Sequence, residues 1–264
     1  MSVQADSGPG LSGARALVTG GTRGIGAATA QRLAAAGAEV VVAARTAPVS
    51  PVPDGCRFVA ADMTTADGVA ALAGQTLELL GGIDVIVSNA GGQTYRPEGA
   101  LHFSDEDWQH DLDLNLLSAV RLDRALVPAM IAQGGGGSIV HVGSGAARLP
   151  RPASLPYTAA KAALTAYSKG LAKDIGRHGI RVNVVLPGLI RTEALEGRLA
   201  LLAEQTGAEP EAVLGRTVAA LDIPLARAGV ADDVAQLIAF LAAPGAAYLT
   251  GSQFTVDGGA LPTI

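Results

Sequence analysis

The sequence has little of the chemistry that disulfides and metal sites require. It contains a single cysteine, Cys56, in 264 residues. One thiol excludes an internal disulfide and any zinc site built from several cysteines. The histidines lack the spacing of metal ligands, so we expect no metal site; they are His102, His110, His141 and His178.

Clusters of positive charge and long apolar runs are also missing. The chain has 19 Lys and Arg against 24 Asp and Glu, a formal net charge of −5, and no basic run that would favour nucleic acid or an anionic membrane. No apolar stretch is long enough to cross a bilayer, and residues 1–10 lack the pattern of a signal peptide. We therefore expect a cytoplasmic protein that binds neither nucleic acid nor membrane.

Aromatic residues make up only 3% of the chain, whereas 49% of it is hydrophobic and 34 residues are glycine. Such a composition suits close packing of small side chains between helices and a sheet. The length is ample for a buried core, and no linker, repeat or low-complexity segment divides it. We expect a flexible N-terminus over residues 1–13 and one domain over residues 14–264.

Apolar runs alternate with segments of helical pattern along that domain. Strands are predicted at 14–19, 39–44, 57–60, 83–88, 138–142, 180–186 and 253–256. Helices are predicted from a glycine-rich turn to about 36 and at 65–80, 105–133, 156–177 and 232–243, with a less regular helical stretch at 193–221. Strands that are apolar throughout and separated by helices predict an α/β fold, in which a doubly wound, Rossmann-type parallel sheet carries helices on both faces.

One pair of residues in the second half could perform acid/base chemistry. Tyr157 and Lys161 lie four residues apart in a predicted helix, and therefore on one face of it. A nearby ammonium favours the phenolate form of a tyrosine by about one to three pKa units. By itself the spacing also fits a tyrosine packed in the core beside a lysine that extends to water.

A glycine-rich turn, Gly20-x-x-x-Gly24-x-Gly26, joins the first predicted strand to the first helix. Free N–H groups and the positive end of the helix dipole make such a turn an anion site, and glycines let a pyrophosphate come close to the backbone. The spacing differs from the G-x-G-x-x-G fingerprint. Alone, it fits either a bound nucleotide or a merely tight turn.

Taken together, the motifs resemble those of the short-chain dehydrogenase/reductase family. The motifs are Thr19-Gly20-x-x-x-Gly24-x-Gly26, Asn89-Ala90-Gly91, Ser144, and Tyr157-x-x-x-Lys161. The resemblance is to the short, single-domain branch, in particular to NADP(H)-dependent 3-oxoacyl and ketone reductases, and it covers the chain beyond its first dozen residues. Ser88 and Gly92 depart from the family pattern without touching its chemistry.

The resemblance implies a catalytic role for Asn115, Ser144, Tyr157 and Lys161. Tyr157 would act as the general acid in carbonyl reduction, and Ser144 would hydrogen-bond the reacting oxygen. Lys161 would lower the pKa of Tyr157 and hold the cofactor ribose. Asn115 would bind a water that connects Lys161 to solvent.

The resemblance also implies a set of dinucleotide-binding residues. Besides Tyr157 and Lys161, they are Gly20, Thr22, Arg23, Gly24, Ile25, Gly26, Arg45, Asp62, Met63, Asn89, Ala90, Gly91, Pro187, Gly188, Ile190 and Thr192. The second predicted strand ends without the carboxylate that binds the ribose of NAD(H). Arg45 follows that strand and Arg23 lies in the glycine turn, so we expect NADP(H) rather than NAD(H), with its 2′-phosphate between two guanidinium groups.

These observations predict an oxidoreductase that moves a hydride between NADP(H) and a ketone or secondary alcohol, most simply as a carbonyl reductase. One alternative is a catalytically silent dinucleotide-binding sensor or scaffold, and another is an NAD-dependent alcohol dehydrogenase of the same family. Family members commonly form dimers or tetramers through two long helices, here 107–133 and 156–177. Interrupted periodicity over residues 190–225 predicts a mobile substrate lid.

Overall fold

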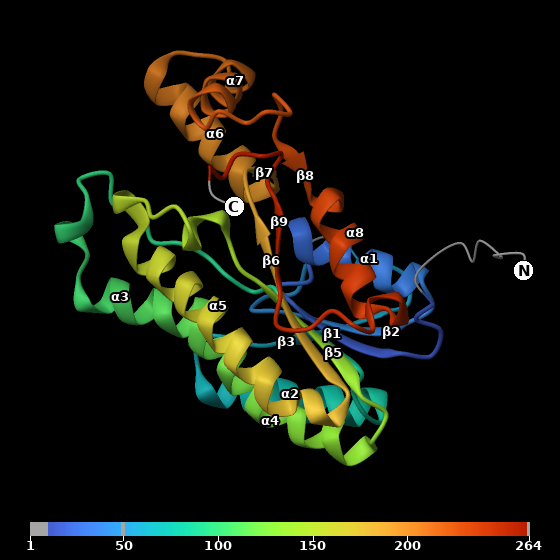
Figure 1. Ribbon diagram of the computed structural model, residues 1–264. Helices are drawn as coiled ribbons and strands as arrows, with labels where there is room; N and C mark the ends of the chain where they lie inside the picture. Colours follow the sequence, from blue (N-terminus) through green and yellow to red (C-terminus); the bar gives the residue numbers. More distant parts are fainter. Residues whose placement is uncertain (1–9, 49–50, 263–264) are drawn as a thin grey trace, which may run out of the picture.

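The computed structural model describes residues 10–48 and 51–262. Seven strands form one sheet in the order β3-β2-β1-β4-β5-β6-β9, and every neighbouring pair is parallel. The doubly wound α/β fold predicted from the alternating pattern is confirmed (Figure 1). The strands are β1 (Arg15–Thr19), β2 (Glu39–Ala44), β3 (Cys56–Ala60), β4 (Val85–Ser88), β5 (Gly137–Val142), β6 (Ile180–Pro187) and β9 (Gln253–Val256).

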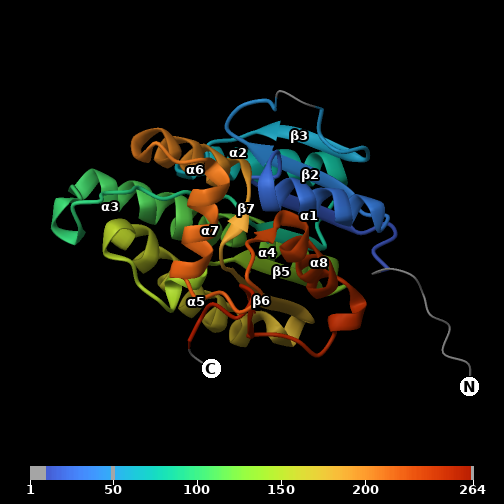
Figure 2. The same ribbon diagram turned by 90° about the horizontal axis from the view of Figure 1, so that it is seen from above.

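Helices cover both faces of this sheet because its strands are apolar on both sides. On one face α1 (Gly24–Ala35) packs against α8 (Ala231–Ala242), and their buried side chains include Leu33 and Ile238. The other face carries α2 (Ala66–Leu80), α4 (Ser118–Gln133) and α5 (Leu155–Ile175), with a core that includes Leu72 and Leu126. Figure 2 shows the sheet between the two helical layers.

The helix predicted at 105–133 is interrupted by a π-helical turn that contains Asn115, one of the predicted catalytic residues. It begins as α3 (Asp105–Leu112), passes through one turn of π-helix, η2 (Asp113–Leu117), and continues as α4. The hydrophobic period of the sequence does not reveal such a turn. A π-turn shifts every later side chain around the helix axis, and such turns are frequent at functional sites.

The irregular stretch at 193–221 is two helices rather than one. α6 (Glu193–Thr206) ends where Gly207 adopts a left-handed conformation, and α7 (Pro210–Ala220) begins at a proline. The pair forms a small core of its own from Leu199, Ala203, Val213 and Leu214. Figure 1 shows α6 and α7 projecting from the carboxyl edge of the sheet, where β7 (Ile190–Arg191) pairs with β8 (Gly229–Val230).

The ends of the fold differ slightly from the predicted boundaries. Residues 1–9 of the expected flexible N-terminus lie outside the described part of the chain. Leu11, however, is only 4% exposed, and its amide donates to the carbonyl of Ala36. The packed structure therefore begins before residue 14. Within the described residues, no helix has both the length and the apolarity needed to cross a membrane.

The strand order reverses between β1 and β4, which are neighbours in the sheet although their chain positions are far apart. In open α/β sheets, ligands bind in the crevice outside the carboxyl ends of the strands at such a reversal. The glycine turn follows β1 and Asn89 follows β4, so both predicted motifs lie at this crevice.

Candidate active site

The glycine turn is fixed to the end of β4 by side-chain hydrogen bonds. Asn89 Nδ2 donates to the carbonyls of Thr19 (2.9 Å) and Gly20 (3.2 Å). The buried Thr19 hydroxyl accepts from the amides of Asn89 and Ala90, both at 3.0 Å. These contacts bring together two motifs that are 70 residues apart in the chain.

Close packing explains the glycines of the turn. A Cβ on Gly26 would lie 2.1 Å from the carbonyl oxygen of Gly20, and Gly20 itself has a φ of +64°. α1 begins at Gly24 with neither a side-chain cap nor an acidic residue in its first turn. Its first N–H groups therefore fit an anionic group such as a pyrophosphate.

Two exposed arginines lie near the glycine turn, at the carboxyl edge of the sheet. Arg23 precedes α1 and Arg45 follows β2, a strand that pairs with β1 so that Thr19 is opposite Ala43. Asp62, after β3, accepts hydrogen bonds from the amide and hydroxyl of Thr64. These bonds, with a smaller effect of the Arg45 charge, lower the pKa of Asp62.

The remaining predicted dinucleotide-binding residues near the glycine turn differ in how far they are buried. The Met63 side chain is 4% exposed and packs in the core, so only its backbone is available at the edge. Thr22 and Ile25 are half-buried within the glycine turn.

Tyr157 and Lys161 face the crevice from the first turns of α5. Lys161 is 3% exposed, and its Nζ donates to the carbonyl of Val142 at 2.8 Å. The same Nζ lies 5.9 Å from the centroid of the Tyr157 ring. The alternative of a lysine that extends to water is wrong, because the ammonium is held inside the protein.

Burial dominates the acid/base properties of this pair. It lowers the pKa of Lys161 to about 8. It also raises the pKa of Tyr157, an effect that a hydrogen bond to Ser144 opposes. The i, i+4 spacing alone predicts a lowered pKa for Tyr157, and burial of the ring acts in the opposite direction.

Ser144 lies just beyond β5, where its hydroxyl accepts from the amide of Ala146 at 3.1 Å. It is close enough to Tyr157 to lower the pKa of that phenol. Both side chains are half-buried at the crevice. The two hydroxyl groups therefore lie in the same part of the site, as binding to a single substrate oxygen requires.

Asn115 completes the cluster from the π-turn. It is 1% exposed, and its Nδ2 donates to the carbonyls of Gly92 (2.8 Å) and Asp111 (2.9 Å). A Cβ on Gly91 would lie 3.0 Å from Asn115 Oδ1 and 3.3 Å from Lys161 Nζ. Gly91 therefore separates the amide of Asn115 from the ammonium of Lys161, and the four predicted catalytic residues converge on one place.

The loop after β6 approaches the glycine turn from the other side. Pro187 ends β6, the Gly188 amide donates to the carbonyl of Val256, and Ile190 is buried. Thr192 caps α6, and its Cγ2 is 3.2 Å from where a Cβ on Gly24 would lie.

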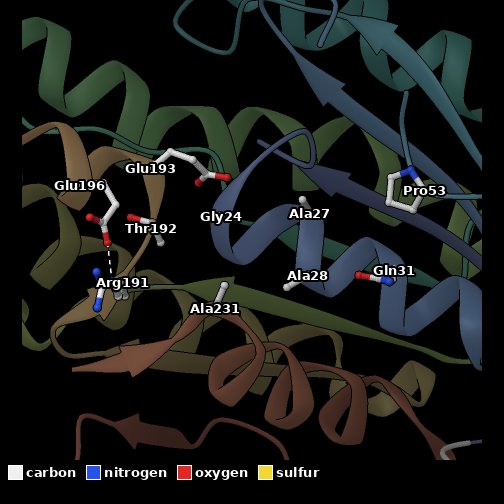
Figure 3. Close-up of a pocket in the computed structure, with 10 residues that line it drawn as sticks. All are labelled: Gly24, Ala27, Ala28, Gln31, Pro53, Arg191, Thr192, Glu193, Glu196 and Ala231. Carbon is white, nitrogen blue, oxygen red and sulfur yellow. Dashed lines mark hydrogen bonds and ion pairs between the residues drawn. The ribbon is translucent and has the colours of Figure 1, made fainter. Parts of the chain in front are cut away.

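A cavity of about 390 Å³ opens beside this junction (Figure 3). In Figure 3 the Glu193 side chain extends toward Gly24, and Arg191 pairs with Glu196. The cavity reaches the glycine turn, but its lining, which lies wholly in the described part of the chain, does not include the catalytic cluster. That lining is Gly24, Ala27, Ala28, Gln31, Pro53, Arg191, Thr192, Glu193, Glu196 and Ala231.

The buried ammonium predicts a pH dependence of stability. Because the pKa of Lys161 falls from 10.5 to about 8 on folding, the unfolded chain binds more protons between these values, and stability rises with pH across that window. We expect wild type to gain up to about 3 kcal/mol relative to Lys161→Met from pH 8 to pH 10.5. Denaturant unfolding at several pH values measures this difference. Lys173→Met, at an exposed position of the same helix, should show no such trend; a parallel response of both variants would contradict the prediction.

Some residues of the site are not apparent from the predicted motifs. Val142 contributes only its backbone carbonyl, which accepts from Lys161, so the identity of its side chain does not indicate that it belongs to the site. Thr94 and Asp111 are joined by hydrogen bonds to both carboxylate oxygens of Asp111. Asp111 precedes Asn115 by four residues, and this helical spacing is the signal that could have placed it on the same face.

Similar proteins agree with this geometry. A family model described as enoyl-(acyl carrier protein) reductase matches residues 20–260. A 3-oxoacyl-[acyl-carrier-protein] reductase of Synechocystis is 39% identical over 254 residues, covering 92% of this chain and 95% of the relative. Among solved structures, L-sorbose reductase from Gluconobacter frateurii, complexed with NADPH and L-sorbose, has a TM-score of 0.90 at 34% identity and covers 97% of this chain and 99% of its own. A short-chain type dehydrogenase/reductase from Mycobacterium marinum has a TM-score of 0.83 at 33% identity, with coverages of 96% and 97%. The chain belongs to the short-chain dehydrogenase/reductase family, whose members are oxidoreductases that act on carbonyl or alcohol substrates with a nicotinamide dinucleotide.

Proposed function

We propose that this protein is an NADP(H)-dependent reductase of a ketone. The observation that carries the proposal is the convergence of Asn115, Ser144, Tyr157 and Lys161 beside a glycine turn that fits a pyrophosphate. The two arginines at the β1–β2 edge, and the absence of a carboxylate at the end of β2, favour the 2′-phosphorylated cofactor. An L-sorbose reductase complexed with NADPH is among its structural relatives.

When bound, the nicotinamide would supply or accept the hydride. The glycine turn and the first N–H groups of α1 would hold the pyrophosphate, while Arg23 and Arg45 would hold the 2′-phosphate. Asp62 and the Met63 backbone would border the adenine; the loop of Pro187, Gly188, Ile190 and Thr192 would border the nicotinamide. The Asn89-Ala90-Gly91 segment would lie between these two ends.

Side chains of the protein would donate the proton to the substrate and allow it to be replaced. Ser144 would hold the substrate carbonyl oxygen by a hydrogen bond, and Tyr157 would donate its proton to that oxygen as it becomes an alkoxide. Lys161, fixed by the Val142 carbonyl, would bind the ribose hydroxyls and favour the phenolate that remains. Asn115 would hold the water through which the proton is replaced.

The alternatives differ in chemistry that can be measured. A catalytically silent sensor would bind the dinucleotide without consuming it, and an NAD-dependent alcohol dehydrogenase would oxidise secondary alcohols with NAD⁺. The test is a screen of ketones with NADPH and of secondary alcohols with NAD⁺ and NADP⁺, read as the change in NAD(P)H absorbance. We expect turnover with NADPH and ketones. Binding of NADPH without turnover on any ketone or alcohol would favour the silent alternative.

The lid is part of this proposal. α6 and α7 pack mainly on each other, so they can move as a unit without breaking the main core. We expect fast amide hydrogen exchange over residues 190–225 in the free protein, slowed by NADPH plus substrate. Exchange measured by mass spectrometry tests this, with α1 as the internal reference. Equal, strong protection in both states would rule out a moving lid.

We also propose a homodimer or homotetramer formed through two long helices, the one at 107–133, which runs from α3 through the π-turn into α4, and the one at 156–177, which includes α5. Exposed or half-buried alanines along α5 would allow close approach of helices from a second copy; they are Ala159, Ala162, Ala163 and Ala166. Light scattering measures the particle directly, and a mass of 26.4 kDa at micromolar concentration would contradict assembly.

A further inference from the structure

Arg121, on α4, is a charged residue that none of the predicted motifs includes. It donates from Nη1 to the carbonyl of Thr64 at 3.0 Å and from Nη2 to Oδ1 of Asp113 at 2.6 Å. The Arg121 and Asp113 side chains are only 25% and 17% exposed. Burying charged groups is costly unless they are paired and hydrogen-bonded, and these contacts meet that requirement. Arg121 therefore connects α4 to a residue 57 positions earlier in the chain.

The π-turn brings Asp113 and Arg121 onto one face of the helix. In an uninterrupted α-helix, residues eight apart point in directions that differ by about 80°. η2 begins at Asp113 and precedes Arg121, and its wider turn takes up roughly one extra residue, which cancels most of that difference. Gln109 Nε2 donates to Oδ2 of Asp113 at 2.7 Å, so both oxygens of the carboxylate are bonded. The turn that carries Asn115 therefore also holds the partner of Arg121.

The other partner of Arg121 belongs to the turn of residues 62–65, which joins β3 to α2. In this turn the Thr64 amide and hydroxyl donate to Oδ1 of Asp62 at 2.9 and 2.7 Å, and the Thr65 side chain caps α2. α2 and α4 pack against each other on one face of the sheet (Figure 1), which lets Arg121 reach the turn. Because Thr64 both accepts from Arg121 and donates to Asp62, Arg121 restrains the Asp62 carboxylate.

The 62–65 turn lies at the adenosine end of the proposed dinucleotide site. β2 and β3 are parallel neighbours, with Ala44 opposite Ala60. Arg45 and Asp62, which follow these two residues, therefore lie side by side at the carboxyl edge of the sheet. The loop that would border the nicotinamide follows β6, which lies beyond β1, β4 and β5 in the sheet.

We propose that Arg121 is a positioning residue for the adenosine half of the cofactor, because together with Asp113 it holds the 62–65 turn ready for binding. Without Arg121, binding would have to order this turn, and ordering a single residue costs about tenfold in affinity. The nicotinamide half would be unaffected, since it binds elsewhere along the crevice. The restraint on the turn rests on the contacts alone, whereas its part in cofactor binding rests on the proposed function.

The test measures the binding of the whole cofactor and of each half by calorimetry. NADPH is compared with adenosine 2′,5′-bisphosphate, which is the adenosine half with its 2′-phosphate, and with reduced nicotinamide mononucleotide, which lacks that half. In Arg121→Met we expect the dissociation constants of NADPH and of the bisphosphate to rise about tenfold. The mononucleotide should bind as it does to wild type.

Two variants accompany this measurement. Arg121→Lys keeps the charge but loses the guanidinium fork, so it should show a smaller rise in the same direction, and it is the second variant should Arg121→Met not fold. Arg124→Met, at an exposed position of the same helix, is the matched control and should bind all three ligands as wild type does.

Amide hydrogen exchange tests the restraint on the turn without any ligand. Residues 62–65 should exchange faster in Arg121→Met than in wild type and in Arg124→Met, with β1 as the internal reference.

Wild-type affinity for NADPH and the bisphosphate in folded Arg121→Met would overturn the proposal. An equal loss of affinity for the mononucleotide would also overturn it, since that indicates a general disturbance of the site. A wild type that binds none of the three ligands would reject the proposed function, and faster exchange over residues 62–65 in its Arg121→Met variant would then still support the restraint on the turn.

Discussion

Replacement of Tyr157 by phenylalanine is expected to lower the turnover number for ketone reduction by about two orders of magnitude or more. Phenylalanine keeps the ring, which is half-buried at the start of α5, and removes only the hydroxyl. That hydroxyl is the group whose pKa Ser144 lowers and that would donate the proton. The loss should therefore appear in kcat rather than in folding.

A measurement of cofactor binding distinguishes the loss of the Tyr157 hydroxyl from a general disturbance of the structure. The residues that would hold the pyrophosphate and 2′-phosphate, around Gly24 and Arg45, lie on other elements than α5. The dissociation constant of NADPH, measured by fluorescence titration, should therefore change little in Tyr157→Phe. Tyr248→Phe, at a fully exposed position near the C-terminus, is the matched control and should keep wild-type turnover. A Tyr157→Phe enzyme with most of its activity would exclude Tyr157 as the acid.

The second large effect is expected at Arg45. Wild type should bind NADPH more tightly than NADH, and Arg45→Asp should shift the ratio of the two dissociation constants toward NADH by about 10- to 100-fold. A charged hydrogen bond contributes about 1.5 to 3 kcal/mol, and each 1.4 kcal/mol is tenfold in affinity. Aspartate would in addition repel a 2′-phosphate while accepting from a ribose hydroxyl.

The measurement is a titration of both cofactors into wild type, Arg45→Asp and a control. Arg177→Asp is suitable because it makes the same change of charge at an exposed position before β6, on the amino-end edge of the sheet. It should leave the ratio unchanged. Equal affinity of wild type for both cofactors, unmoved by Arg45→Asp, would mean that Arg45 does not bind the 2′-phosphate.

The sequence by itself determined the fold class and the order along the chain of the main strands and helices, because both depend on local patterns. The run Val40-Val41-Val42 is apolar on both sides of a strand, so it must be covered by helices on both faces of the sheet. The glycines before α1 and the Tyr157–Lys161 spacing are likewise local, and together they were sufficient to indicate the family.

Only the tertiary structure decided how these pieces act on one another. The hydroxyl of Thr19 meets a backbone amide 70 residues away, and the π-turn that turns Asn115 toward Lys161 leaves no mark in the hydrophobic period. The direction of the Tyr157 pKa shift is the clearest case. By itself a nearby lysine is expected to lower that pKa, but burial, which only the packed fold provides, raises it.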